Sequence, residues 1–309
     1  MSTDDLEIVR CPFELRREAL AVVLCELAPS QRRAAAKDLL EVEDASALAR
    51  EPLFIARRDG RLCGAAWGQR QSGNIAIFWP PQLVSGEVAQ TSLPLAEVVM
   101  RELDETAVSL AQSLLVDPEP AMIDVLQQVG FQHVADLLYL TCESERFPVA
   151  APEPCEVGFE EYRETQRGRL REVIERTYKD TLDCTALNGA RDLDDVVNGY
   201  QATGEFRAEN WLFVRSGGRD VGVLLLADHR PSKQWELMYM GLVPEARGRG
   251  WGRQIARYAQ WLARGARVER VLVAVDAANK PAADAYRSSG FELWERRVVY
   301  VRIRAEQHQ

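Results

Sequence analysis

The chain has 309 residues, of which 47% are hydrophobic and 28% charged, an ordinary globular composition for one large or two average domains. It has no apolar run of about 18 residues and no signal-like start, so we expect no membrane span and a cytoplasmic protein. The net charge of −9 argues against a nucleic-acid partner. Six cysteines occur singly and three histidines are scattered, so no metal is expected.

The charge is distributed unevenly along the chain. Residues 1–150 carry 13 Lys+Arg and 23 Asp+Glu, a net charge of −10, whereas residues 241–309 carry 13 and 7, a net charge of +6. A basic segment in an acidic protein indicates a local anionic ligand. A solvated, arginine-rich helix face would give the same count, so the alternative stays open.

A proline-containing segment at 146–154 predicts a linker between two domains, 1–145 and 155–309. The two halves share landmarks. Hairpin signals reach Gly64 and Gly222, and a Gly-Phe pair follows 66 and 68 residues later, at Gly130 and Gly290. Two features that keep their separation within two residues indicate a tandem duplication.

Each half is predicted to have the same order of elements. A short strand at Glu7–Cys11 or Glu156–Phe159 precedes two helices, a hairpin, a strand, a helix, a strand, a helix that ends at Gly-Phe and a final strand. In the second half we expect helices at 160–179, 193–203, 251–265 and 282–288, a hairpin at 211–227, and strands at 235–243, 271–275 and 298–303. This order predicts the α/β class, with a mixed, mostly antiparallel sheet flanked by helices in each domain.

The strongest chemical signal is the segment Pro244–Gly252, between a predicted strand and a predicted helix. Its three glycines allow close approach of a ligand, and the first N–H groups of the helix are free to bind an anion. Together with nearby arginines, this segment predicts a phosphate cradle. It is not a P-loop, because no Gly-Lys-Ser/Thr follows. It is not a dinucleotide fingerprint either, because the glycines are spaced G-x-G-x-G and no βαβ unit with a ribose-binding acid surrounds them. A glycine-rich turn without a ligand is the alternative.

At this point the chain resembles the GNAT acyltransferases. Their pyrophosphate motif, Gln/Arg-x-x-Gly-x-Gly/Ala, is matched by Arg247, Gly250 and Gly252. Their Asn…Ala…Tyr…Gly-Phe pattern is matched by the segment Asn279–Phe291, which contains Tyr286. The resemblance is specific over 210–303. The first half matches only the hairpin and the Gly-Phe ending, so the chain resembles a tandem GNAT protein whose first domain is degenerate.

The resemblance implies that the second domain transfers an acetyl group directly from acetyl-CoA to a primary amine of a small molecule or peptide. The residues implied in binding acetyl-CoA are Leu242, Val243, Arg247, Gly248, Arg249, Gly250, Trp251, Gly252, Arg253 and Asn279. Transfer to a hydroxyl, or a non-catalytic CoA-binding module that engages a partner protein, remain alternatives. The chain is expected to be a monomer or a homodimer.

Two residues are candidates for proton transfer. Tyr286 could protonate the leaving thiolate, although a core aromatic side chain is the alternative. Glu236 could accept the amine proton; strand alternation puts it on one face with Met238 and Met240, and it could equally be an exposed strand residue. Tyr239 is a lesser candidate on the opposite face.

The loop 180–192 is expected to cover the acceptor. Its acidic residues Asp180, Asp183 and Asp192 would attract a cationic amine, unless they merely cap helices. The first half has no glycine-rich loop near Ala89, and Leu126 occupies the position of Tyr286. We therefore expect one acetyl-CoA per chain, in the second domain.

Overall fold

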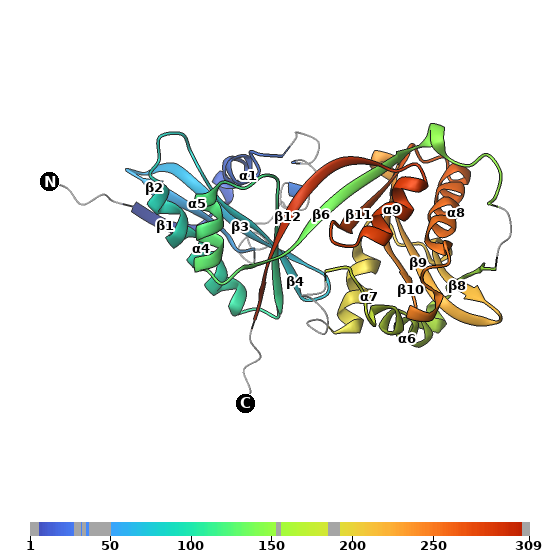
Figure 1. Ribbon diagram of the computed structural model, residues 1–309. Helices are drawn as coiled ribbons and strands as arrows, with labels where there is room; N and C mark the ends of the chain where they lie inside the picture. The colour runs from blue at the N-terminus through green and yellow to red at the C-terminus, as the bar shows by residue number, and fades with distance from the viewer. Residues whose placement is uncertain are drawn as a thin grey trace, which may run out of the picture. The chain divides into compact units, whose positions relative to one another are not determined.

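The computed structural model describes residues 6–27, 32, 35–36, 51–152, 156–184 and 192–304 (Figure 1). It forms two compact units. The first comprises Met1–His133 with Val299–Gln309, and the second comprises Val134–Val298. Among the described residues, no helix is both long and apolar enough to cross a membrane.

Strands β6 (Gln132–Glu143) and β12 (Glu292–Ile303) each cross a boundary between the units. The predicted domains 1–145 and 155–309 are continuous segments of the chain. The compact units differ from them, because the first unit includes the end of β12 and the second includes most of β6. Within the predicted linker, residues 147–152 contain neither helix nor strand, and residues 153–154 lie outside the described part.

The first unit has a mixed sheet in which β4 and β5 are parallel and the other adjacent pairs with a described register are antiparallel. Its strands are β1 (Leu6–Arg10), β2 (Leu53–Arg58), β3 (Arg61–Gln71), β4 (Ile75–Leu83) and β5 (Leu110–Leu115), followed in the sheet by the end of β12. Its helices are α1 (Arg16–Val23), α4 (Ser92–Asp104) and α5 (Pro120–Gln128). The second helix expected before the hairpin falls mostly outside the described residues.

The second unit has the strand order β6-β11-β10-β9-β8-β7, and β10 and β11 are its parallel pair. Its remaining strands are β7 (Gly158–Glu161), β8 (Trp211–Ser216), β9 (Arg219–His229), β10 (Gln234–Leu242) and β11 (Arg270–Asp276), and its helices are α6 (Arg167–Tyr178), α7 (Leu193–Ala202), α8 (Trp251–Gly265) and α9 (Lys280–Ser288). The predicted α/β class, with mixed and mostly antiparallel pairing flanked by helices, is confirmed, but the described strands form one twelve-stranded sheet instead of a separate sheet in each domain.

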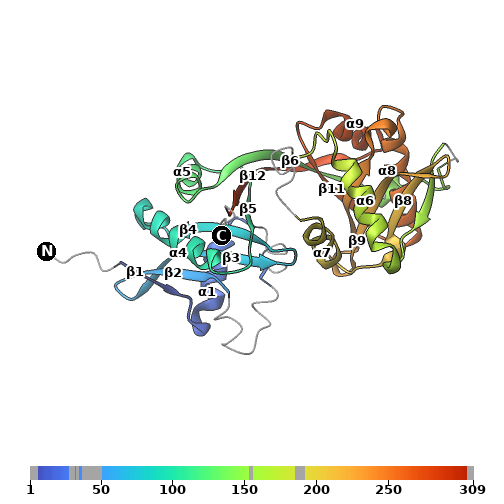
Figure 2. The ribbon, with the colours of Figure 1, turned by 90° about the horizontal axis from the view of Figure 1, so that it is seen from below.

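In the second unit, α8 and α9 lie on one face of the strands and α6 and α7 on the other (Figure 2), and a hydrophobic cluster fills each interface. One contains Leu237 with residues of α8 and α9, such as Ile255, and the other contains Trp211 with residues of α6 and α7, such as Ile174. The apolar stripe predicted for 251–265 is therefore the buried side of α8. Burial of this stripe supplies most of the stability of such a helix.

Strands β10 and β11 pair over only part of their length. Gln234–Leu237 pair with Arg270–Val273, and beyond this point the two strands no longer pair with each other, although β10 runs on to Leu242 and β11 to Asp276. The open end between them is the splay that positions the site.

A β-bulge interrupts the pairing of β10 with β9 between Leu237 and Tyr239. Beyond the bulge, the side chains of β10 change faces. Tyr239 lies with Met238 on the face covered by α6, and Met240 lies with Leu237 on the face covered by α8. The prediction that Met240 shares a face with Glu236 and Met238 is wrong, because the bulge inserts one residue into the alternation.

Candidate active site

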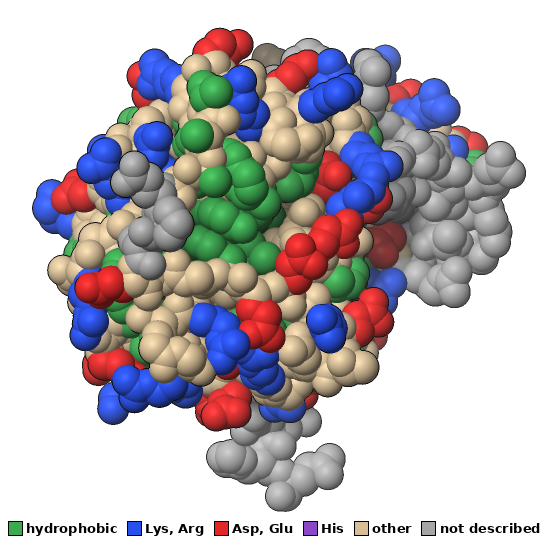
Figure 3. Space-filling model, turned by 90° about the vertical axis from the view of Figure 1, so that its right-hand side faces the viewer, with side chains coloured by type: hydrophobic (Ala, Val, Ile, Leu, Met, Phe, Trp, Pro, Cys, Tyr) green, Lys and Arg blue, Asp and Glu red, His purple; other side chains and the backbone are tan. Residues whose placement is uncertain are grey.

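A cavity of about 720 Å³ opens at the splay between β10 and β11. Its walls are the ends of these strands, the first turns of α8 and α9, and part of the strap, the residues 177–184 that end α6 and follow it. A hollow floored by hydrophobic side chains and bordered by charged ones is visible on one face of the protein (Figure 3). A concave, partly apolar space at the ends of parallel strands is a typical place for a small ligand.

Eight of the ten residues implied in binding line this cavity, namely Leu242, Arg247, Gly248, Gly250, Trp251, Gly252, Arg253 and Asn279. Val243 does not; it is buried in the core, and its N–H donates to the carbonyl of Val221 on β9. Arg249 lines a neighbouring recess with Arg253 and Arg257, opposite the linker residues 148–152. Arg253 and Arg257, four residues apart, lie on one face of α8, and Arg249 lies in the loop just before the helix.

The glycine loop has the geometry of an anion-binding turn. Gly248 and Gly250 both have φ of +76°, and Gly250 is the N-cap of α8. A Cβ built at either position would meet no atom within 4 Å, so the backbone here faces open space. The first N–H groups of α8 and the positive end of its dipole are therefore available to a phosphate.

The splayed edge of β10 also offers backbone groups to the cavity. The N–H of Val243 is directed to β9. Because successive residues of a strand direct their N–H groups to opposite edges, those of Met240 and Leu242 face the splay. Both residues line the cavity, so an extended ligand could pair with this edge as an added strand.

The side chain of Arg247 donates hydrogen bonds to four backbone carbonyl groups. Its guanidinium donates to the carbonyls of Leu242 (3.0 Å), Asp180 (2.7 Å), Thr177 and Lys179 (both 2.8 Å). The motif predicts that this charge is directed at a phosphate. The structure instead shows a forked clamp that caps the C-terminal end of α6 and joins it to β10.

Tyr286 is 4% exposed and lines the cavity from α9. Its ring packs edge-on against Phe291, 5.5 Å away, and its hydroxyl has no hydrogen-bond partner among the described residues. Burial, and secondarily the charge of Asp183, raise the pKa of Tyr286. The phenol is therefore protonated at neutral pH and able to donate.

Glu236 does not line the cavity. Its carboxylate lies 3.0 Å from Nε2 of His229, and both side chains are about one-third exposed (31% and 29%). The contact of His229 with Glu236 could not be predicted from the sequence, because no spacing rule links the two residues before the pairing of β9 with β10 is known. Asn279 caps α9 by accepting from the N–H of Ala282 (3.3 Å), which leaves its amide N–H groups for the cavity.

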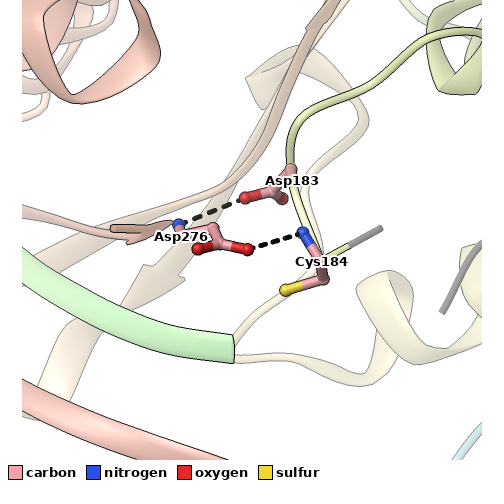
Figure 4. Close-up of side chains that lie close together, drawn as sticks. All are labelled: Asp183, Cys184 and Asp276. Atoms are coloured by element: carbon pink, nitrogen blue, oxygen red, sulfur yellow. Dashed lines mark hydrogen bonds between the residues drawn. The ribbon is translucent and has the colours of Figure 1, made fainter. Parts of the chain in front are cut away.

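Asp183, Cys184 and Asp276 gather where the strap meets β11 (Figure 4). Their ligand atoms lie within 4.8 Å of one another, but both oxygens of Asp276 already accept backbone N–H groups, from Ala278 and Cys184. Burial raises the pKa of the Cys184 thiol to about 12, so the reactive thiolate is disfavoured there. Asp192 is confirmed as a helix cap, because it accepts the N–H groups of Asp194 and Asp195. Residues 185–191 of the predicted acceptor loop lie outside the described part.

The described part of the first unit shares elements of the second unit's fold, but at the corresponding positions it lacks the glycine loop and the tyrosine. Phe131 donates to the carbonyl of Leu126 (2.9 Å) as Phe291 donates to that of Tyr286 (3.2 Å), so Leu126 and Tyr286 are structural equivalents. The residue before α4 is Thr91, where Gly250 precedes α8. Pro80 and Pro81, near the end of β4, have no N–H to offer a ligand.

Residues 174–291 match the family model described as "Acetyltransferase (GNAT) family". The matched segment makes up most of the second repeat, which is therefore similar to the GNAT acetyltransferases. The matched segment contains the glycine loop, the splay, Asn279 and Tyr286, and most of the cavity lining.

Among curated proteins, the mycothiol acetyltransferase of Thermobifida fusca is 39% identical over 71 residues, which cover 23% of this chain and 22% of the relative. That of Corynebacterium glutamicum ATCC 13032 is 34% identical over 95 residues, which cover 31% of this chain and 32% of the relative. The matched stretches thus span less than a third of these relatives.

Two solved GNAT structures resemble the whole chain. A GCN5-related N-acetyltransferase from Sphaerobacter thermophilus gives a TM-score of 0.67 at 14% identity, covering 98% of this chain and 97% of that one. A tandem GNAT protein from the clavulanic acid biosynthesis pathway gives 0.53 at 13% identity, covering 97% and 98%. These likenesses establish the tandem GNAT fold over the full length.

Proposed function

We propose that the second unit binds acetyl-CoA and transfers its acetyl group directly to a primary amine. The observation that carries this proposal is the cavity at the β10–β11 splay, which joins a positive-φ glycine loop at a helix N-terminus to a buried tyrosine hydroxyl that has no hydrogen-bond partner among the described residues. Both features belong to the segment that matches the GNAT family model.

The residues present fit acetyl-CoA along its length. The glycine loop and the start of α8 would hold the pyrophosphate, and Met240 and Leu242 would pair with the pantetheine arm. The recess of Arg249, Arg253 and Arg257 next to the loop suits the phosphate on the ribose. Acetyl-CoA held by these residues would supply the thioester that reacts with the amine.

The chemistry then requires a proton donor for the thiolate and an acceptor for the amine proton. Tyr286 would donate to the thiolate as the C–S bond breaks. Two carboxylates could take the amine proton: Glu236, from outside the described cavity lining, and Asp183, from within it. The protonated Cys184 thiol agrees with direct transfer rather than an acetyl-cysteine intermediate.

Release of free CoA thiol should be followed with acetyl-CoA and a panel of primary amines, including tyramine, spermidine, D-glucosamine and an amine related to mycothiol, the molecule that appears in the relatives' names. The proposal predicts amine-dependent release and an acetylated amine by mass spectrometry. Acetyl-CoA binding without turnover would favour a non-catalytic module that engages a partner, and transfer to alcohols alone would favour an O-acyltransferase.

A further inference from the structure

The strap is fastened at both ends to the two strands that separate. At its start, Arg247 binds the carbonyls of Thr177, Lys179 and Asp180 and also that of Leu242 on β10. At its end, the N–H of Cys184 donates to Asp276 on β11 (3.0 Å), and the N–H of Asp276 donates to Oδ1 of Asp183 (3.2 Å; Figure 4). The strap therefore bridges the open end of the splay and holds Asp183 against the cavity.

The carboxylate of Asp183 lines the cavity without a cation to balance it. The side chain is half-buried, and neither it nor Asp276 forms an ion pair with a described lysine or arginine. Burial, and then the neighbouring charge of Asp276, raise the pKa of Asp183. A partly desolvated carboxylate beside a second one is unfavourable unless a cation or a proton joins it.

A second observation points to the same place. Tyr286 is 4% exposed, its hydroxyl has no hydrogen-bond partner in the described part of the chain, and it lines this cavity. The charge of Asp183 contributes to the raised pKa of Tyr286, so the two groups act on one another across the cavity. The carboxylate of Asp183 and the phenol of Tyr286 thus line the same cavity. Among the described residues, the carboxylate has no balancing cation and the phenol has no hydrogen-bond partner, so the two groups could act as base and acid on a bound ligand.

We propose that Asp183 is a catalytic residue that binds the ammonium group of the acceptor and accepts its first proton. This role rests on the acetyl transfer proposed above. The carboxylate takes one proton from R–NH₃⁺, and the free amine forms a C–N bond to the thioester carbonyl carbon. As the C–S bond breaks, Tyr286 gives its proton to the thiolate and regains one from the nitrogen. Asp183 releases the first proton to water, which balances the reaction.

The same geometry restricts the acceptor. Asp183 lines the cavity and the carboxylate of Asp276 lies close behind it, so an amine with its own neighbouring carboxylate would be repelled. We expect amines such as tyramine to be accepted in preference to their α-carboxylated partners such as tyrosine. Glu236 is less suited to hold the ammonium, because its carboxylate is engaged by His229 and lies outside the described lining.

The test compares Asp183→Asn with wild type, using the best amine of the panel. Asparagine keeps the Oδ1 acceptor for the N–H of Asp276 and so preserves the strap, while it removes the charge and the base. We expect kcat/KM for the amine to fall by roughly 10²–10⁴-fold with little change in acetyl-CoA affinity. Hydroxylamine, which is uncharged at neutral pH, should be far less affected, and Asp183→Glu should recover part of the activity.

Each outcome bears on the proposal. Wild-type-like rates for Asp183→Asn, or equal losses with hydroxylamine and with the charged amine, would overturn the role as base. A large loss confined to Glu236→Gln would move the base to that residue. If wild type acetylates no amine, the proposed function itself fails, and a folded Asp183→Ala variant that acts like wild type would exclude any role for the carboxylate.

Discussion

The guanidinium of Arg247 donates a 2.7 Å hydrogen bond to the backbone carbonyl of Asp180, 67 residues earlier in the chain. Arg247 occupies the first position of the glycine-loop motif, and Asp180 lies in the strap. A motif residue that looks from sequence like a phosphate ligand thus connects the glycine loop to the strap.

Arg247→Lys should loosen this connection while it keeps the positive charge. A lysine cannot reach four carbonyls at once, so we expect a loss of about 1–3 kcal/mol in the free energy of unfolding by urea titration. The KM for the amine should rise more than the KM for acetyl-CoA. Arg249→Lys is the control, because that side chain is 55% exposed and its nearest carboxylate is 4.0 Å away; it should change stability by less than about 0.5 kcal/mol. Equal changes in both variants would contradict the clamp.

Gly250→Val should abolish acetyl-CoA binding, because its φ of +76° is strained for a β-branched residue and its Cβ would project into the open space above the loop. Gly218→Val is a matched control: it has the same φ of +76°, also faces open space, and lies in the β8–β9 turn. Calorimetric titration should show binding for the second variant alone. Retained binding in a folded Gly250→Val protein would refute the loop assignment.

Tyr286→Phe should lower turnover by roughly 10²–10⁴-fold while acetyl-CoA affinity and stability stay near wild type. The hydroxyl has no partner to lose among the described residues, so its removal costs little. Tyr239→Phe provides the contrast, because it breaks a 2.7 Å bond to Thr177 and should cost about 1 kcal/mol in thermal or urea unfolding. A Tyr286→Phe enzyme within about twofold of wild type would remove the proposed role of the hydroxyl.

The elements around the glycine loop could be predicted closely from the sequence. The helix expected at 251–265 is α8 at Trp251–Gly265, because three glycines and an apolar stripe fix both its start and its buried face. The bulge at Met238 could not be predicted, since the alternation of Gln234–Gly241 reads without interruption. The pairing of β6 with β11 also escaped prediction, because it joins segments more than 120 residues apart and leaves no local signal.

The sequence predicts the site residues that belong to a local motif. It does not predict the contacts between side chains that are far apart in the sequence and meet only in the folded protein. Gly248, Gly250 and Tyr286 belong to local patterns, and they line the cavity. The carbonyl partners of Arg247 and the contact of Asp183 with Asp276 depend on how the strap packs on the sheet. No spacing rule relates residues 93 positions apart.

Protonation of Glu160 at low pH should lower the free energy of unfolding of the second unit. Hydrogen bonding by Arg169 holds the pKa of Glu160 at about 2. Because this lies below the unfolded value of about 4.3, the interaction stabilises the fold fully above about pH 5 and is lost as the pH falls toward 2. Glu160→Gln should therefore be less stable than wild type at pH 7, and the difference should shrink on acidification in urea titrations. Glu161→Gln, at an exposed neighbour with no ion pair to a described residue, should match wild type. A difference for Glu160→Gln that stays constant down to pH 2 would contradict the assignment.

The central claim is that one cofactor site exists per chain and that it lies in the second repeat. Thr91, Leu126 and the Pro80-Pro81 pair replace the features that would hold acetyl-CoA in the first repeat, and the net charge is −10 over residues 1–150 against +6 over 241–309. Calorimetric titration of the full chain with acetyl-CoA measures this directly. The account predicts a stoichiometry of one, whereas a stoichiometry near two, or no binding, would contradict it.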